Sequence, residues 1–226
     1  MSIDLKKQLE FFDPDTYVDG EEIHVIGVGA IGSQVVEMLA RMGFNELSLY
    51  DFDVVDPHNI TNQMYFADQF EKSKLECTME LCQRINPHFT AEVYEEGWKQ
   101  GMPLAGHVIL AVDNIDLRRQ IVEEHMNNPM IVSMCDFRMG LTNAQHYFAD
   151  WQQEKLKKNF LASMQFTHEE AKESTPVSAC GTSLNVLPTV RMITALGTAN
   201  FMNFLKNGEA KKVILTDAFL PSVEAY

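Results

Sequence analysis

Apolar residues along the chain follow two alternating patterns, which are short β-rich runs and longer stretches with helical spacing. Ile23, Val25 and Ile26 form a run that suits a buried parallel strand. Residues 33–42 come next, with apolar side chains at i+3 and i+4 spacing, which indicates a helix. Because strands and helices keep alternating in this way, we predict an α/β fold. Its core would be a doubly wound, Rossmann-like and mostly parallel sheet with helices on both faces.

The same patterns place the other elements of the predicted fold. Further strands are expected at residues 46–50, 90–94, 108–112 and 130–134, and helices at residues 2–12, 71–85 and 116–126. The second half is expected to hold an antiparallel strand at 140–150, a helix at 152–163, a mobile loop at 165–179, a long apolar helix at 181–205 and a short strand at 213–215. The fold therefore ends in a C-terminal helix plus short strands.

Three glycines, Gly27, Gly29 and Gly32, follow the first strand at G-x-G-x-x-G spacing. Glycine at the first positions permits a tight turn and a close approach of the backbone to phosphate, and glycine at the last lets the helix pack against the strand. The start of that helix offers free N–H groups and the positive end of its dipole. Asp51 follows the second strand about 20 residues after Gly32, where an acid that binds ribose is expected. This order of elements predicts a nucleotide site.

The residues from Asp51 onward resemble a family signature. The pattern D-x-D-x-V-x-x-x-N-x-x-R-Q is typical of the ThiF/MoeB/HesA superfamily of ubiquitin-activating-type (UBA) adenylyltransferases, and this chain matches it at Asp51, Asp53, Val55, Asn59 and Gln63. The resemblance continues with Lys74, with RINP at residues 84–87 and with AVDN at residues 111–114. It implies a site for ATP rather than NAD.

The resemblance also implies a single ThiF-type nucleotide-binding domain over residues 1–226. Within it we expect an N-terminal helix and lead-in at residues 1–20, a crossover loop at 164–181, and a C-terminal helix and strand at 182–226.

Individual residues receive roles from the same resemblance. The expected nucleotide-binding residues are Gly27, Gly29, Gly32, Asp51, Asp53, Asn59, Gln63 and Lys74. Lys74 would also neutralise phosphate charge during catalysis, and Asp113 would bind Mg²⁺, a hard cation that prefers carboxylate and phosphate oxygen. Plainer alternatives are open for these positions. Lys74 would then be a solvated helix lysine beside Lys72, Asp113 a helix cap, and Asn59 and Gln63 ordinary turn residues.

Two cations of the family pattern are missing from this sequence. Asn62 stands where the family keeps the arginine before Gln63, and the N-terminus lacks the family's R-Y-x-R-Q. Asparagine keeps a hydrogen-bond donor but loses the charge that would act on the leaving pyrophosphate. Either Arg118, Arg119, Arg138 or a partner subunit supplies this charge, or the site binds nucleotide without turning it over.

Cysteine placement bears on a second reaction step. Relatives that form a thioester with a ubiquitin-like protein carry their cysteine in a crossover loop, and Cys180 lies between the predicted loop and the long helix. A thiol at a helix N-terminus ionises more readily and is a better nucleophile. The alternative is a packed small residue, as expected for Cys77, Cys82 and Cys135. Because the four cysteines form no C-x-x-C pair, we expect no structural zinc, and a reducing compartment fits the chain.

Composition narrows the class of protein further. The 226 residues carry 18 basic and 32 acidic side chains, a formal net charge of −14, which argues against a nucleic-acid or membrane-surface partner. The N-terminus lacks an apolar signal core, and no apolar run approaches the length of a membrane span. We therefore expect a cytoplasmic protein.

Together these features favour an enzyme that uses ATP to adenylylate the C-terminal carboxylate of a small ubiquitin-like or sulfur-carrier-type protein or a peptide. Thioester transfer to Cys180 would be a further step. A second hypothesis is a catalytically reduced nucleotide-binding subunit that pairs with a complete homologue, and a third is an NAD-dependent oxidoreductase. The long apolar segment near the C-terminus predicts association, either as a homodimer or as a heterodimer with a homologue.

Overall fold

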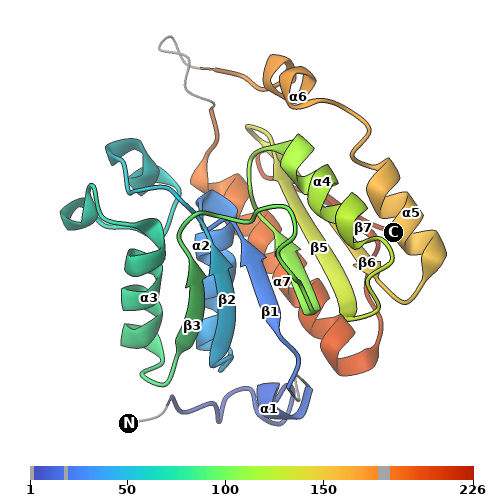
Figure 1. Cartoon of the computed structure of the whole chain (residues 1–226). Coiled ribbons are helices and arrows are strands. Elements are labelled where there is room, and N and C mark those ends of the chain that lie inside the picture. The colour runs from blue at the N-terminus through green and yellow to red at the C-terminus, as the bar shows by residue number, and fades with distance from the viewer. Residues whose placement is uncertain (1–2, 18–19, 178–183) are drawn as a thin grey trace.

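A single mixed sheet forms the centre of the molecule (Figure 1). The computed structural model describes residues 3–17, 20–177 and 184–226. In the described chain eight strands pair in the order β3-β2-β1-β4-β5-β6-β7-β8. Strands β1 to β5 run parallel, and β6 to β8 are antiparallel, which confirms the predicted α/β class and mostly parallel sheet. The strands are β1 (Ile23–Ile26), β2 (Glu46–Tyr50), β3 (Thr90–Tyr94), β4 (Gly106–Leu110), β5 (Ile131–Met139), β6 (Asn143–Asp150), β7 (Val213–Asp217) and β8 (Ser222–Ala225).

Helices cover both faces of the sheet, as predicted for a doubly wound fold (Figure 1). Val25 and Ile109 belong to the core on one face, and Ile26 and Leu110 to the core on the other, because successive side chains of a strand point to opposite sides. The first face carries α2 (Ala30–Arg41), α3 (Lys74–Ile85) and α7 (Leu187–Asn207), and the second α4 (Ile115–His125), α5 (Glu154–Ala162) and α6 (His168–Ser174).

The N-terminal segment does not form the helix predicted at residues 2–12. Residues 6–11 form turns, and the first helix, α1 (Pro14–Tyr17), begins only at a proline. Phe12 is buried against Phe44, with 5.9 Å between the ring centroids. The prediction was wrong because a short isolated helix is marginal in water, so packing against the domain decides the conformation of this segment.

A helix also lies inside the segment predicted as a loop at residues 165–179. Helix α6 starts with a capping box, in which Glu170 N donates to Thr167 Oγ1 (3.1 Å) and Thr167 N donates to Glu170 Oε2 (2.7 Å). The T-x-x-E spacing is the signal that predicts such a start. The loop prediction was wrong because it relied on missing apolar periodicity, which a short exposed helix does not need.

Helix α7 begins at Leu187, later than the predicted start at residue 181, and Pro188 lies in its first turn. Cys180 is among residues 178–183, which lie outside the described residues. The expected position of Cys180, at or before the first turn of this helix, therefore stays a prediction. Within the described ranges, α7 and the other helices lack the combination of length and apolar character needed to cross a membrane.

Three short elements were not predicted. Two are 3₁₀ helices, η1 (Pro57–Thr61) and η2 (Ala67–Gln69), and the third is the edge strand β8. All side chains of β8 are exposed, so this strand has no apolar pattern that the sequence could reveal.

His146 of β6 is buried in the core, where its ring lies 4.5 Å from that of Phe137. Asn200 Nδ2 of α7 donates a hydrogen bond to His146 Nε2 (3.2 Å). Burial lowers the pKa of His146 to about 4, although the negative charge of Asp136 acts in the opposite direction. The imidazole is therefore neutral in the native protein at neutral pH.

Lowering the pH from about 7 to about 5 is expected to destabilise the fold through His146. A histidine of the unfolded chain binds a proton below a pKa of about 6.5, whereas native His146 stays neutral down to a pH of about 4. The stability that neutral His146 contributes is therefore present above the unfolded pKa and is lost as the pH falls. The free energy of unfolding should be lower by about 2 kcal/mol at pH 5. Urea unfolding at both pH values tests this with His146→Gln and the exposed control His58→Gln. The fall in unfolding free energy from pH 7 to pH 5 should be smaller than in the wild type for His146→Gln alone. If His146→Gln loses as much as the wild type, the assignment of His146 as the acid-sensitive group is wrong.

Candidate functional site

Residues 27–29, here called the glycine turn, connect β1 to α2. The turn leaves open space at one position. Gly27 has φ +93°, and a Cβ there would lie 2.9 Å from Val112 N. A Cβ on Gly32 would lie 1.8 Å from Gly27 O, so the helix touches the turn directly. Nothing lies within 4 Å of a Cβ built on Gly29, the residue just before α2. The first N–H groups of α2 thus start beside open space, which is the geometry that a phosphate cradle needs.

Asp51 lies next to this turn because β1 and β2 are paired up to Ile26 and Tyr50. Its Oδ2 accepts a hydrogen bond from Val28 N (2.7 Å) and its Oδ1 from Asp53 N (2.9 Å). Burial raises the pKa of Asp51, and these two hydrogen bonds act against that rise. Each carboxylate oxygen can accept a further donor, so ribose hydroxyl groups suit this position.

Lys74 is buried and paired, which excludes the solvated-lysine alternative. It is the first residue of α3, and its side chain is only 7% exposed. Nζ lies 2.8 Å from Asp53 Oδ2, and Lys74 N donates to Asp53 O (3.0 Å). A lysine held in this way, one loop from the glycine turn, can bring a fixed positive charge to a phosphate. Lys72, in contrast, is exposed.

Asp113 lies just beyond β4, close to the glycine turn, since a Cβ on Gly27 would lie 2.9–3.0 Å from backbone atoms of Ala111 and Val112. Its side chain is exposed. The helix-cap alternative is wrong, because Asn114 caps α4 by accepting from the backbone N–H groups of Asp116 (2.9 Å) and Leu117 (3.1 Å).

A magnesium site at Asp113 fits this geometry. The carboxylate forms no hydrogen bond or ion pair with the part of the chain that the structure describes, and oxygen is the ligand that Mg²⁺ prefers. The described residues contain no group of three or more His, Cys, Asp or Glu side chains arranged to hold a metal. Mg²⁺ commonly takes one or two carboxylates together with phosphate oxygens, so a single aspartate is consistent with binding alongside nucleotide.

Asn59 and Gln63 lie in the loop that follows β2. Asn59 is buried in η1, and its Oδ1 accepts from Asp56 N (2.8 Å), so it does act as a structural cap. Gln63 Oε1 is buried and has no hydrogen-bond partner in the described chain. Buried acceptors are normally satisfied, so Gln63 Oε1 has room for one more donor, from a bound ligand or a water molecule.

Tyr65 is a positioning residue that sequence reasoning missed. Its hydroxyl donates to Val28 O (2.5 Å) and lies 3.2 Å from Thr78 Oγ1 of α3. Met64 N donates to Ser33 Oγ (3.2 Å), in the first turn of α2. The loop is thus held against the glycine turn from two sides. Its signal in the sequence is weak, an aromatic residue soon after Gln63.

Arg118, Arg119 and Arg138, the residues considered as substitutes for the missing cations, are all engaged elsewhere. Arg138 Nε donates to Asp136 Oδ2 (2.6 Å), and Arg118 donates to the other oxygen of the same buried carboxylate. Arg119 pairs with Asp116 and donates to two backbone carbonyls. These arginines therefore hold the fold together behind the site rather than reaching into it.

Asn62, at the place of the family arginine, is also held by the protein. Its side-chain amide donates to Asn185 Oδ1, and its backbone carbonyl accepts from Gln34 Nε2 (2.9 Å). The side chain is mostly buried. It is therefore a link between this loop and the segment before α7.

The thiols that the structure describes do not suit nucleophilic catalysis. Cys77, Cys82 and Cys135 are buried. Burial raises the pKa of Cys77 to about 11 and that of Cys82 to about 12, and it also raises the pKa of Cys135. They match the packed-residue expectation, which leaves Cys180 as the candidate nucleophile.

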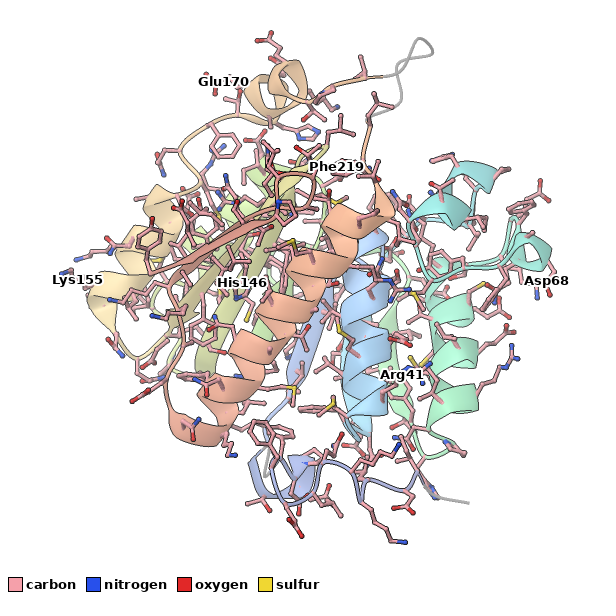
Figure 2. The ribbon with its side chains drawn as sticks, turned by 180° about the vertical axis from the view of Figure 1, so that it is seen from behind. Arg41, Asp68, His146, Lys155, Glu170 and Phe219 are labelled. Carbon is pink, nitrogen blue, oxygen red and sulfur yellow. The ribbon has the colours of Figure 1, made fainter. Side chains whose placement is uncertain are left out.

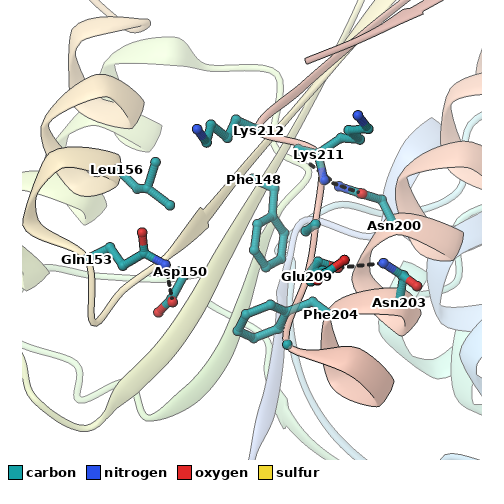
Figure 3. Close-up of a pocket in the computed structure, with 12 residues that line it drawn as sticks. Phe148, Asp150, Gln153, Leu156, Asn200, Asn203, Phe204, Glu209, Lys211 and Lys212 are labelled. Atoms are coloured by element: carbon teal, nitrogen blue, oxygen red, sulfur yellow. Dashed lines mark hydrogen bonds between the residues drawn. The ribbon is translucent and has the colours of Figure 1, made fainter.

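A separate hollow of about 350 Å³ lies between α5, β6 and the end of α7 (Figure 3). Phe148, Phe204 and Lys212 are among the residues that line it. Because β6 is antiparallel to β5, this hollow lies at the end of the sheet opposite the glycine turn. It is not part of the site described above.

Comparison with known proteins gives one family and two groups of relatives. The ThiF family model matches residues 10–218. A molybdopterin-synthase adenylyltransferase from Haemophilus influenzae is 28% identical over 128 residues, covering 53% of this chain and 53% of that protein. Ubiquitin-like modifier-activating enzyme 5 from Drosophila virilis is 30% identical over 117 residues, covering 44% of this chain and 29% of that protein. The chain thus spans about half, or less, of the length of these relatives.

Solved structures share the fold. E. coli MccB with ATP superposes with a TM-score of 0.70 at 16% identity, covering 94% of this chain and 64% of MccB. PaaA superposes with a TM-score of 0.69 at 14% identity, covering 99% of this chain and 68% of PaaA.

Proposed function

The chain belongs to the ThiF family, and from this premise we propose that it activates a carboxylate by adenylylation with ATP. The substrate would be the C-terminal carboxylate of a small ubiquitin-like or sulfur-carrier-type protein or of a peptide. The observation that carries this proposal is the convergence of the glycine turn, Asp51, Lys74 and Asp113 at the carboxyl ends of β1, β2 and β4. The names of the relatives support it, since they include adenylyltransferases and modifier-activating enzymes, and MccB is known bound to ATP and to MccA.

In this reaction a carboxylate oxygen of the substrate attacks the α-phosphorus of ATP, and the bond to the departing pyrophosphate breaks. The products are an acyl-adenylate and pyrophosphate. The N–H groups at the start of α2 would bind phosphate oxygens, and Asp51 would accept from the ribose hydroxyl groups. Lys74, held by Asp53, would offset the negative charge that builds up on the phosphates. Bound Mg²⁺, with Asp113 as ligand, would neutralise further phosphate charge.

Cys180 is proposed for a second step. Its thiolate would attack the acyl carbon of the adenylate, forming a thioester and releasing AMP. Assembly as a homodimer, or as a heterodimer with a complete homologue, is also part of the proposal.

The alternative of a catalytically reduced subunit rests on Asn62. This side chain is uncharged and already bonded to Asn185, so it offers no cation to the leaving pyrophosphate. Such a protein would bind Mg·ATP without turning it over. An NAD-dependent oxidoreductase is the third choice, supported by the glycines and Asp51 alone.

Pyrophosphate exchange into ATP separates these functions. With Mg²⁺ and a panel of small carrier proteins ending in Gly-Gly, we expect exchange that depends on one carrier and is at least 10-fold slower in Asp113→Asn (roughly the value of one charged ligand). Asp113 is exposed, so the melting temperature should stay unchanged. Calorimetric titration completes the test. Binding of Mg·ATP without exchange favours the reduced subunit, and tighter binding of NAD than of ATP would overturn the proposal.

A further inference from the structure

Helix α7 and the residues just before it lie against the loop that carries Asn62. Asn185, just before the helix, accepts from Asn62 Nδ2. Thr194, further along the helix, donates its hydroxyl proton to Val190 O (2.8 Å) and lies 3.4 Å from Gln34 Oε1, while Gln34 Nε2 donates to Asn62 O (2.9 Å). The first turns of α7 are therefore fixed against this loop, next to the start of α2 (Figure 2).

Arg191 lies between these two attachments. Its Nη2 is 3.2 Å from Met64 Sδ, so its guanidinium reaches the residue immediately after Gln63. Met64 N is bonded to Ser33 Oγ in the first turn of α2. Met64 thus lies between Arg191 and the first turn of α2, where phosphate would bind.

No residue in the described part of the chain neutralises the charge of Arg191. The side chain is exposed and forms no ion pair with any residue that the structure describes. A thioether is a weak acceptor that carries no charge, so Met64 places the guanidinium without satisfying it. In a protein with a net charge of −14, such a cation beside the start of α2 is suited to an anionic ligand.

We propose that Arg191 binds the β- and γ-phosphates of the nucleotide and supplies the positive charge that Asn62 lacks. The planar guanidinium donates to two phosphate oxygens at once, which makes arginine a stronger phosphate ligand than a neutral amide. The phosphate-binding cation is thereby carried by α7 rather than by the loop after β2. This inference rests on the proposed function, because it requires ATP in the glycine turn.

Calorimetric titration of Arg191→Ala with Mg·ATP and with AMP tests the proposal. We expect ATP to bind roughly 10- to 100-fold more weakly, since a charged hydrogen bond is lost. AMP should bind as in the wild type, because it lacks the β- and γ-phosphates. Arg191→Lys should recover part of the ATP affinity. Arg41→Ala removes the same charge at the far end of α2 and should change neither affinity (Figure 2).

The outcomes distinguish the role of Arg191 from the proposed function. If the wild type binds ATP and Arg191→Ala binds it equally well, the role of Arg191 is wrong and the proposed function stands. Equal losses for ATP and AMP would also overturn the role, because they would show a general disturbance of the site. If the wild type binds no ATP, the proposed function fails and the inference fails with it.

Discussion

Replacing Lys74 with methionine is expected to slow pyrophosphate exchange by roughly two to three orders of magnitude, the usual effect of removing a group that stabilises transition-state charge. Methionine keeps an unbranched apolar stem, so the buried part of the side chain is still filled. What is lost is the ammonium that lies 2.8 Å from Asp53 Oδ2. Exchange rates at saturating ATP, together with the ATP dissociation constant, measure the loss directly.

Lys72→Met is the matched control, because Lys72 is exposed and two residues away. It should exchange within about twofold of the wild type, as expected for a surface substitution. Thermal melting of both variants without nucleotide separates folding from catalysis. If Lys74→Met melts at a lower temperature but keeps its exchange rate, Lys74 has only a structural role.

Replacing Gly32 with alanine is expected to destabilise the fold by about 3 kcal/mol or more, at the upper end of the cost of overpacking. The new methyl carbon would lie 1.8 Å from Gly27 O and 2.8 Å from Gly27 C, so the helix or the turn must move. Backbone atoms cannot rotate away as a flexible side chain does. Urea unfolding of Gly32→Ala measures the loss.

Gly29→Ala is the informative comparison in the same turn. Nothing lies within 4 Å of the new methyl group, so its cost in stability should be much smaller. The same methyl group would occupy the open space beside the start of α2 and should weaken ATP binding. Similar stability losses for both variants would mean that the close contact between Gly32 and Gly27 is not what fixes this turn.

Much of the fold could be predicted because its central strands are buried on both faces. Strands such as β1 and β4 can be predicted from their apolar runs alone, without knowing which strands lie beside them. The glycines between β1 and α2 mark the turn. The pattern failed where burial is one-sided or absent, as in α6 and β8. It also failed at the start of α7, where apolar residues continue upstream of the helix.

The candidate site could be predicted only as a set of residues, not as a set of contacts. Asp51, Lys74 and Asp113 stand out by position in the sequence, but the pairing of Lys74 with Asp53 depends on a loop that folds back from α3. The arginines illustrate the limit most clearly. Arg118 and Arg138 were candidates from the sequence, yet both bind Asp136, whereas Arg191, in the sequence only a polar residue of the long apolar helix, lies beside the loop.

The shared use of Asp136 by Arg118 and Arg138 leaves one positive charge without a counterion inside that cluster. Asp136 is fully buried, and Arg118 also donates to the backbone carbonyl of Val112, the residue before Asp113. Charges shielded from water act over longer distances than those on the surface. The cluster of Asp136, Arg118 and Arg138 therefore carries a net positive charge below the rim where β4 ends, although the molecule as a whole is acidic. An incoming anion would be attracted to that rim without touching either guanidinium.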